Sequence, residues 1–156
     1  MKPIDKLLSQ YGESHQNPTN KVIHWLCVPL IMFSLIGLLF SIPFPTEKSI
    51  LANWGSITLL LALLYYLRLS FSLFLGFLGI AAVLIYGNHA LWMALNQSNL
   101  YLTYASLAVF FVAWVGQFYG HKIEGKKPSF LKDIQFLLIG PAWLLHFIYK
   151  KLNIPY

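Results

Sequence analysis

Residues 11–30, YGESHQNPTNKVIHWLCVPL, decide the fold, because a polar segment that bears two histidines leads directly into a long apolar segment. Asn17 followed by Pro18 is typical of a helix start. The asparagine side chain can accept hydrogen bonds from unpaired backbone N–H groups, and proline is tolerated at the first helical position. We therefore expect a new helix to begin at Pro18, immediately after a tight corner.

The same corner predicts that two histidines lie close together. Tyr11 and His15 are four residues apart before the corner, and Asn20 and His24 are four residues apart after it, so each pair shares one helix face. A tight turn between the two segments would bring His15 near His24. The alternative is that one histidine caps the corner while the other lies among lipid headgroups.

The composition is that of an integral membrane protein, since 58% of the residues are hydrophobic and only 10% are charged. A membrane span needs roughly 20 apolar residues. The first four apolar stretches therefore predict transmembrane helices, whereas the fifth is short and is interrupted by Gly140-Pro141, which favours a re-entrant or interfacial helix. The five stretches are residues 25–43, 50–67, 71–95, 101–119 and 134–149.

The chain is thus expected to be all-α, with residues 1–156 forming a single membrane-embedded helical domain. The bundle would contain about four transmembrane helices. An amphipathic helix over residues 3–15 would precede it, because Ile4, Leu7, Leu8 and Tyr11 recur at helical spacing.

The basic residues predict the orientation in the membrane. With a cytoplasmic N-terminus, Lys48 is the only one of the 11 Lys and Arg residues left outside, which is the positive-inside pattern. A net charge of +6 suits anionic membrane lipid, and no basic run interleaves with aromatic residues as a nucleic-acid surface would require. We expect a multi-pass protein that binds no nucleic acid. The small size and the absence of sorting tails favour a bacterial inner membrane over the endoplasmic reticulum.

The histidines are candidate metal ligands. Ionisable groups in or beside apolar helices are costly and often functional, and neutral imidazoles bind zinc, copper, iron or nickel. One interpretation is a shared metal site. The other is that the histidines are separate interfacial and hydrogen-bonded residues. The five are His15, His24, His89, His121 and His146.

Two motifs resemble a known family. Residues 11–24 read YxxxHxNxxNxxxH and residues 117–121 read QFYGH, and Gly125, Pro128 and Gly140-Pro141 follow them. Together they resemble the membrane-bound 2-hydroxy fatty acid dioxygenase family over nearly the whole chain. The resemblance implies an Fe(II)-dependent α-oxidation that consumes a 2-hydroxy fatty acid and O₂, releases the carboxyl carbon as CO₂ and leaves an acid one carbon shorter.

The resemblance also implies a set of site residues, with no catalytic group beyond the metal ligands. The implied ligands are His15, His24, His89 and His121. Residues expected to support the ligands or contact the substrate are Tyr11, Asn17, Asn20, Gln117, Glu124 and His146. If the fourth span continues as a helix, Gln117, His121 and Glu124 form one polar stripe at its end.

His89 conflicts with this set on geometric grounds. At a rise of about 1.5 Å per residue, an unbroken helix from Phe71 would place His89 far from the interface where the other three histidines lie. A bent helix or two separate sites would remove the conflict.

Two other functions stay open at this point. The chain would be a non-enzymatic membrane lipid-binding or scaffold protein if its histidines are structural. It would be a zinc-dependent membrane lipid hydrolase if turnover needs no O₂.

Overall fold

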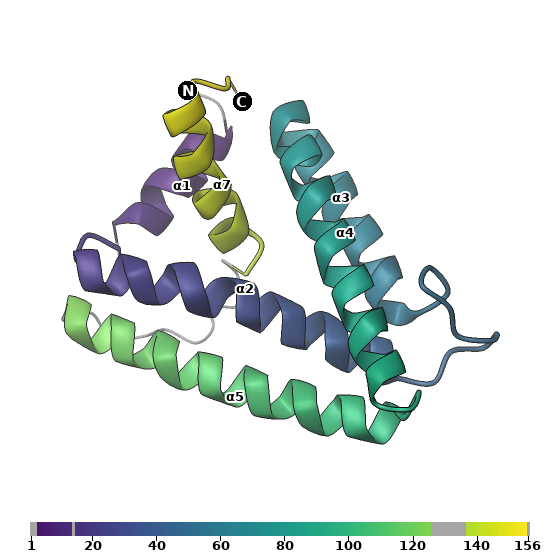
Figure 1. Ribbon diagram of the computed structural model, residues 1–156. Helices are drawn as coiled ribbons and strands as arrows, with labels where there is room; N and C mark the ends of the chain where they lie inside the picture. The colour runs from purple at the N-terminus through teal and green to yellow at the C-terminus, as the bar shows by residue number, and fades with distance from the viewer. Residues whose placement is uncertain (1–2, 14, 126–136, 156) are drawn as a thin grey trace.

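The computed structural model describes residues 3–13, 15–125 and 137–155, and within them all regular secondary structure is helical (Figure 1). This confirms the all-α prediction. Pro128 and the first residues of the fifth apolar stretch, 134–136, lie outside the described residues. The helices are α1 (Pro3–Gly12), α2 (Pro18–Ser41), α3 (Trp54–Leu69), α4 (Phe71–Ala94), α5 (Asn99–Glu124) and α7 (Ile139–Leu152).

Three of the helices, α2, α4 and α5, are long and apolar enough to cross a membrane. Their outward faces carry large apolar side chains that water would not solvate favourably, which confirms the prediction of a membrane protein. With 16 residues, α3 is about 24 Å long, shorter than the hydrocarbon core of about 30 Å. Of the four predicted spans, the second, over residues 50–67, therefore stays a prediction. Examples of these exposed side chains are Leu26 on α2, Val83 on α4 and Phe111 on α5, at 65–71% exposure.

The helices are arranged as two pairs that diverge. α2 and α5 lie side by side along their length, and α3 and α4 form a second pair that meets the C-terminal end of α2 (Figure 1). Toward the N-terminal end of α2 the two pairs separate, and α1 and α7 lie on that side. The diverging pairs leave a wedge that α7 partly fills.

Small residues allow α2 and α5 to approach closely. A Cβ atom added at Gly116 of α5 would lie 2.6 Å from Cys27 Sγ, and one added at Gly120 would collide with the Asn20 side chain. Close backbone approach at such residues is a common way of packing membrane helices. It brings the C-terminal end of α5 against the corner that precedes α2.

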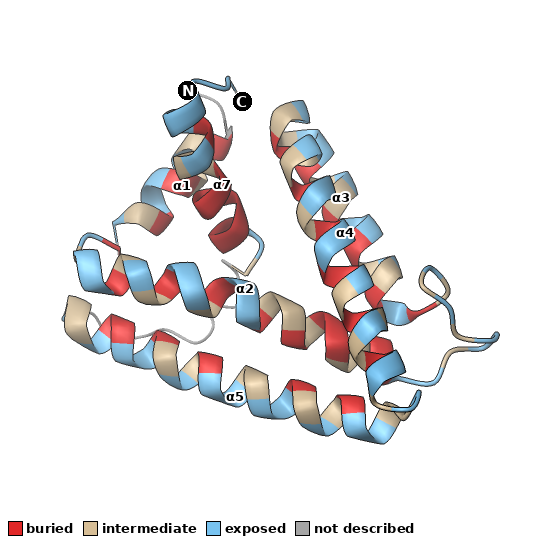
Figure 2. Cartoon of the chain, in the orientation of Figure 1, coloured by how far each residue is buried: buried red, intermediate tan, exposed pale blue. Residues whose placement is uncertain are grey.

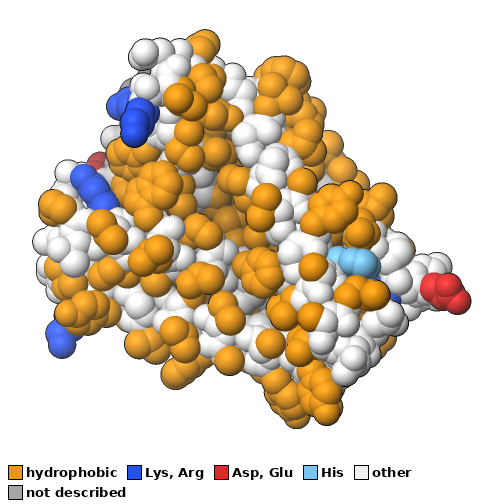
Figure 3. All heavy atoms as spheres, viewed as in Figure 1, with side chains coloured by type: hydrophobic (Ala, Val, Ile, Leu, Met, Phe, Trp, Pro, Cys, Tyr) orange, Lys and Arg blue, Asp and Glu red, His pale blue; other side chains and the backbone are white. Residues whose placement is uncertain are grey.

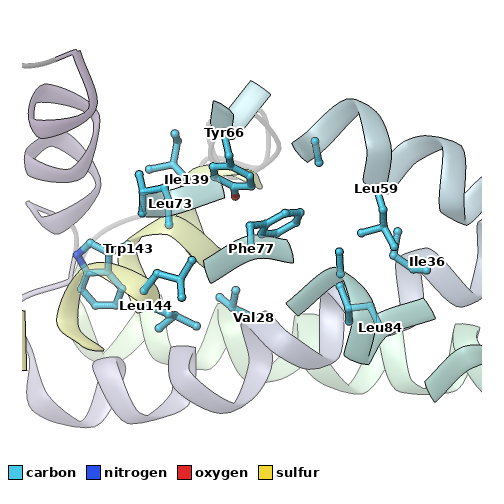
Figure 4. Close-up of a cluster of buried hydrophobic side chains, with 14 of the residues drawn as sticks. Val28, Ile36, Leu59, Tyr66, Leu73, Phe77, Leu84, Ile139, Trp143 and Leu144 are labelled. Atoms are coloured by element: carbon cyan, nitrogen blue, oxygen red, sulfur yellow. The ribbon is translucent and has the colours of Figure 1, made fainter. Parts of the chain in front are cut away.

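The core is a connected set of apolar side chains on the facing sides of the helices, drawn red in Figure 2. In Figure 4, Ile36 lies near Leu59 and Leu84 where the two pairs meet, while Val28 faces Leu144 of α7. The burial of these side chains fixes how the two pairs cross.

Tyrosine hydroxyls attach α7 to the second pair. The Tyr66 hydroxyl donates to the Leu138 carbonyl, and the Tyr149 hydroxyl donates to the Ser72 carbonyl at 2.6 Å. With 14 residues, about 21 Å, α7 is too short to cross a membrane, in keeping with the predicted re-entrant or interfacial helix. Pro141 stands in its first turn, where proline is tolerated.

Candidate metal centre

The polar corner forms as its sequence predicts. α1 ends at Gly12 and α2 begins at Pro18. The Asn17 side chain caps α2 by accepting hydrogen bonds from the backbone N–H groups of Thr19, at 2.9 Å, and Asn20, at 3.4 Å. The predicted helix start is confirmed, and the short connection brings the end of α1 close to the first turns of α2.

Three histidines from three separate segments meet beside this corner. His15 precedes α2, His24 lies on its second turn, and His121 lies near the end of α5. The ring centroids of His15 and His24 are 4.2 Å apart, those of His24 and His121 are 5.0 Å apart, and those of His15 and His121 are 5.4 Å apart. One nitrogen from each ring lies within 4.8 Å of the other two, and all three side chains are buried. We call this set the three-histidine cluster.

Backbone carbonyls hold two of these rings in a defined orientation. His15 Nδ1 lies 2.7 Å from the Tyr11 carbonyl oxygen, and His24 Nδ1 lies 3.0 Å from the Asn20 carbonyl oxygen. A neutral imidazole that donates through Nδ1 carries its lone pair on Nε2. The carbonyls thus favour the tautomer in which Nε2 can bind a metal, as backbone or carboxylate partners commonly do for metal-binding histidines.

A small cavity adjoins the cluster. Its volume is about 30 Å³, and both apolar and hydrogen-bonding side chains line it. The Tyr11 ring stacks on His15 with the centroids 4.2 Å apart and the planes at 13°, and the Gln117 side chain hydrogen-bonds to His24. The lining residues are Tyr11, His24, Val28, Ile31, Trp114, Gln117, His121, Leu137 and Gly140.

Glu124 ties the corner to α5. Its carboxylate accepts hydrogen bonds from the backbone N–H groups of Gln16, at 2.7 Å, and Asn17, at 2.9 Å, and from the Asn20 side-chain amide, at 3.0 Å. A carboxylate at the start of α2 also complements the positive end of the helix dipole. Because His121 is three residues before Glu124, this contact holds His121 in register with the two histidines of the corner.

The structure places His89 elsewhere. It lies on α4, with its ring centroid 6.3 Å from that of Phe40 and 6.0 Å from that of Trp92. Phe40 and His24 are on the same helix at opposite ends, about 24 Å apart at a rise of about 1.5 Å per residue. α4 runs unbroken from Phe71, so the anticipated geometric conflict is real and His89 does not join the cluster.

His146 is likewise apart from the three-histidine cluster. It lies on α7 beside a polar groove between α1 and α7, with Asp5 and Lys150 nearby. Burial and the Lys150 charge lower the pKa of His146, while Asp5 opposes them. Of the residues expected to support the ligands, Tyr11, Asn17, Asn20, Gln117 and Glu124 are at the site and His146 is not.

Trp143 is a residue of the site that sequence reasoning missed. Its ring lies 5.2 Å from that of His15 and 5.4 Å from that of Tyr11, measured between centroids. It follows Gly140-Pro141 by two residues, but nothing in the spacing links α7 to the corner. Only the folding of α7 against α1 brings this ring to the cluster.

The residues present fit a divalent transition metal. Three neutral imidazoles suit iron, zinc, copper or nickel, and a site with three protein ligands leaves coordination positions for an external molecule. Among the described residues, this cluster contains histidines and neither cysteine nor carboxylate. The arrangement can therefore hold a metal ion beside a cavity lined on its other sides by mainly apolar residues.

These features define a class of protein: a membrane-embedded helical protein with a buried histidine centre at one end of its helices. The chain belongs to the Mpo1-like family, since the family model described as "2-hydroxy-palmitic acid dioxygenase Mpo1-like" matches residues 1–152. This confirms the family expected from the two motifs. The chain is similar to 2-hydroxy-palmitic acid dioxygenase MPO1 of Saccharomyces cerevisiae, with 29% identity over 149 residues, covering 92% of this chain and 78% of that protein. No solved structure matches.

Proposed function

We propose that this protein is an Fe(II)-dependent dioxygenase that shortens 2-hydroxy fatty acids by one carbon within a membrane. The observation that carries the proposal is the convergence of His15, His24 and His121 in a chain that belongs to the Mpo1-like family. These three residues would hold the iron. His89 has no part in this proposal, because it lies on α4 beside Phe40, at the opposite end of α2 from the three-histidine cluster.

The reaction balances without an external reductant. One 2-hydroxy acid and one O₂ give one acid shorter by a carbon, one CO₂ and one water, so the C1–C2 bond of the substrate breaks and O₂ takes up all four electrons. Bound iron would supply the O₂ chemistry and a binding place for the hydroxyl and carboxylate of the substrate.

The chain's own residues orient the reactants and exclude water. The carbonyls of Tyr11 and Asn20 set the ring orientation of two ligands, and Glu124 fixes the corner that bears them. Val28 and Ile31 give the cavity an apolar wall that keeps water from the reacting carbon. Gln117, which lines the same cavity, can donate a hydrogen bond to a substrate oxygen.

An oxygen-consumption assay tests the proposal. Detergent-purified protein, loaded anaerobically with Fe(II), should consume O₂ on addition of 2-hydroxypalmitate and release CO₂ and pentadecanoate in equal amounts. Three histidines also suit zinc, so the assay is repeated without O₂ and with zinc in place of iron. Turnover in the absence of O₂, or none with iron and O₂, would overturn the proposal.

The orientation in the membrane is part of the same proposal. Arg68, Lys122 and Lys150 stand in the last turns of α3, α5 and α7, and Lys48 follows α2 at the opposite end. We place the three-histidine cluster near the cytoplasmic surface. A protease site inserted beside Glu47 should then be cut in spheroplasts and protected in inverted vesicles, and the reverse pattern would contradict this orientation.

A further inference from the structure

An apolar groove runs between α2, α4 and α7, in the wedge where the two helix pairs diverge. Its volume is about 460 Å³, and Figure 3 shows apolar side chains around a recess on this face. Residues from all three helices form its walls: Trp25, Pro29 and Met32 from α2, Gly76, Gly79, Ile80, Val83 and Leu84 from α4, and Pro141, Leu144, Leu145 and Ile148 from α7.

Gly79 leaves the groove open. A Cβ atom added at Gly79 would meet nothing within 4 Å, whereas one at Gly76 would collide with the Tyr149 hydroxyl and one at Gly87 would lie 2.8 Å from the Phe33 ring. Gly76 and Gly87 therefore serve close packing, and Gly79 does not. Instead, Gly79 exposes bare helix backbone along one wall of the groove.

The groove and the metal-site cavity share a wall. Gly140 lines the cavity and the next residue, Pro141, lines the groove. On α2, His24 and Val28 line the cavity, and Trp25 and Pro29, each one residue further on, line the groove. The two spaces therefore lie on neighbouring faces of the same two helices, α2 and α7.

The two spaces differ in polarity. The cavity carries two imidazoles and the Gln117 amide among apolar residues, whereas every side chain that lines the groove is apolar. A ligand with a polar head and a hydrocarbon tail would match both at once. The cavity and the groove would thus hold the head and the tail of one molecule that passes over Gly140-Pro141.

We propose that this groove holds the hydrocarbon tail of the 2-hydroxy acid while its head lies at the three-histidine cluster, an inference that rests on the proposed function. A second apolar groove of about 440 Å³ lies between α3 and α4, lined by residues that include Ile57, Leu60 and Ala82. Its lining includes no residue of α2, α5 or α7, so it shares no wall with the cluster. It provides a matched control of similar size.

The first test uses Gly79→Phe with Ala82→Phe as its control. Because a Cβ atom at Gly79 would meet nothing within 4 Å, the new ring can extend from this wall into the groove. Each methylene group excluded from an apolar site lowers affinity about fourfold. We expect Gly79→Phe to lower kcat/KM for 2-hydroxypalmitate by about 10-fold to 100-fold, equivalent to the loss of two or three methylene contacts, and to leave 2-hydroxyoctanoate nearly unchanged. Ala82→Phe should leave both values as in the wild type.

The outcomes separate this inference from the proposed function. If the wild type turns over no 2-hydroxy acid of any length, the proposed function fails. If the wild type is active and Gly79→Phe keeps its chain-length profile, only the assignment of the groove fails.

A second measurement does not depend on turnover. Wild-type protein in phosphatidylglycerol nanodiscs is photolabelled with a 2-hydroxy fatty acid that carries a diazirine at its tail. Labelled peptides should come from residues 76–84 and 141–148, and excess 2-hydroxypalmitate should abolish the label. Labelling of residues 57–63 instead, or labelling that the competitor does not reduce, would overturn the proposal even if Gly79→Phe failed to fold.

Discussion

The two ends of α2 present two different uses of a histidine in an apolar setting. At the N-terminal end, His15, His24 and His121 bring their rings together from three segments. At the C-terminal end, His89 lies beside Phe40 and Trp92, with Lys48 over both aromatic rings.

The second end is organised around a cation and aromatic rings. Lys48 Nζ donates to Asn99 Oδ1 at 2.7 Å and lies 5.3 Å from the Phe40 ring centroid and 5.7 Å from that of Trp92. The indole N–H of Trp92 donates to the same Asn99 oxygen at 3.0 Å. Partial burial lowers the pKa of the Lys48 ammonium. This end closes the loop after α2, and among the described residues His89 belongs to no group of three His, Cys, Asp or Glu side chains that could hold a metal ion.

The comparison shows that an isolated histidine in a membrane helix is weak evidence for a metal. What distinguishes the first end is convergence of several imidazoles, with backbone carbonyls that fix two of the ring tautomers. The following predictions test whether the two ends differ as this account requires.

The largest effect is expected from a ligand replacement. His24→Ala should lower turnover of a 2-hydroxy acid by more than about 100-fold, since changes in groups that only support a ligand already cost up to that much. His89→Ala should stay within about threefold of the wild type, the usual scatter of such contributions. The measurement is kcat/KM for O₂ consumption on Fe(II)-loaded protein, and equal losses in both variants would remove the distinction between the two ends.

The next effect concerns the hydrogen bonds by which Glu124 of α5 holds the corner before α2. Glu124→Gln keeps the shape but removes the charge that three donors share, so iron affinity should fall about 10-fold to 100-fold. Its control is Glu47→Gln, an exposed carboxylate in the loop at the other end of α2. Titration with Fe(II) against a competing chelator measures the dissociation constant of both variants. An unchanged dissociation constant for Glu124→Gln would show that the hydrogen bonds of Glu124 do not position the ligands.

A smaller effect should follow from widening the α2–α5 contact. Gly120→Ala places a methyl group against the Asn20 side chain and should lower the free energy of unfolding by about 1–3 kcal/mol. Gly79→Ala, where the methyl group meets open space, should not destabilise the protein. Thermal unfolding in detergent compares the two, and a stable Gly120→Ala variant would show that α5 can shift away from the corner without loss.

The smallest effect belongs to the far end. Lys48→Met removes one hydrogen bond and the cation–π contacts, so stability should fall by about 1 kcal/mol while iron content stays at the wild-type value. Thermal unfolding and elemental analysis of the same preparation check both parts. Loss of iron in Lys48→Met would mean that the two ends of α2 are coupled.

The sequence predicts local features of the cluster well, because they depend on spacing along one helix or across one tight corner. The helix start at Pro18, the shared face of Asn20 and His24, and the continuation of α5 to His121 and Glu124 all appear in the structure. The family, too, follows from the motifs at these positions.

Other features depend on which helices meet, and local spacing does not contain that information. The position of His146 depends on how α7 folds against α1. The three contacts of Glu124 depend on the close approach of α5 at Gly120. The separation of His89 from the cluster was foreseeable from the helix rise alone, although the family resemblance favoured including it.

Metal content is the measurement that tests the central claim most directly. The wild type, His121→Ala and His89→Ala are purified in parallel, loaded anaerobically with Fe(II), desalted and analysed for iron. The account predicts about one iron per chain in the wild type and in His89→Ala, and almost none in His121→Ala with its fold intact. Iron retained by His121→Ala, or absent from well-folded wild type, would contradict the assignment of His15, His24 and His121 as the metal centre.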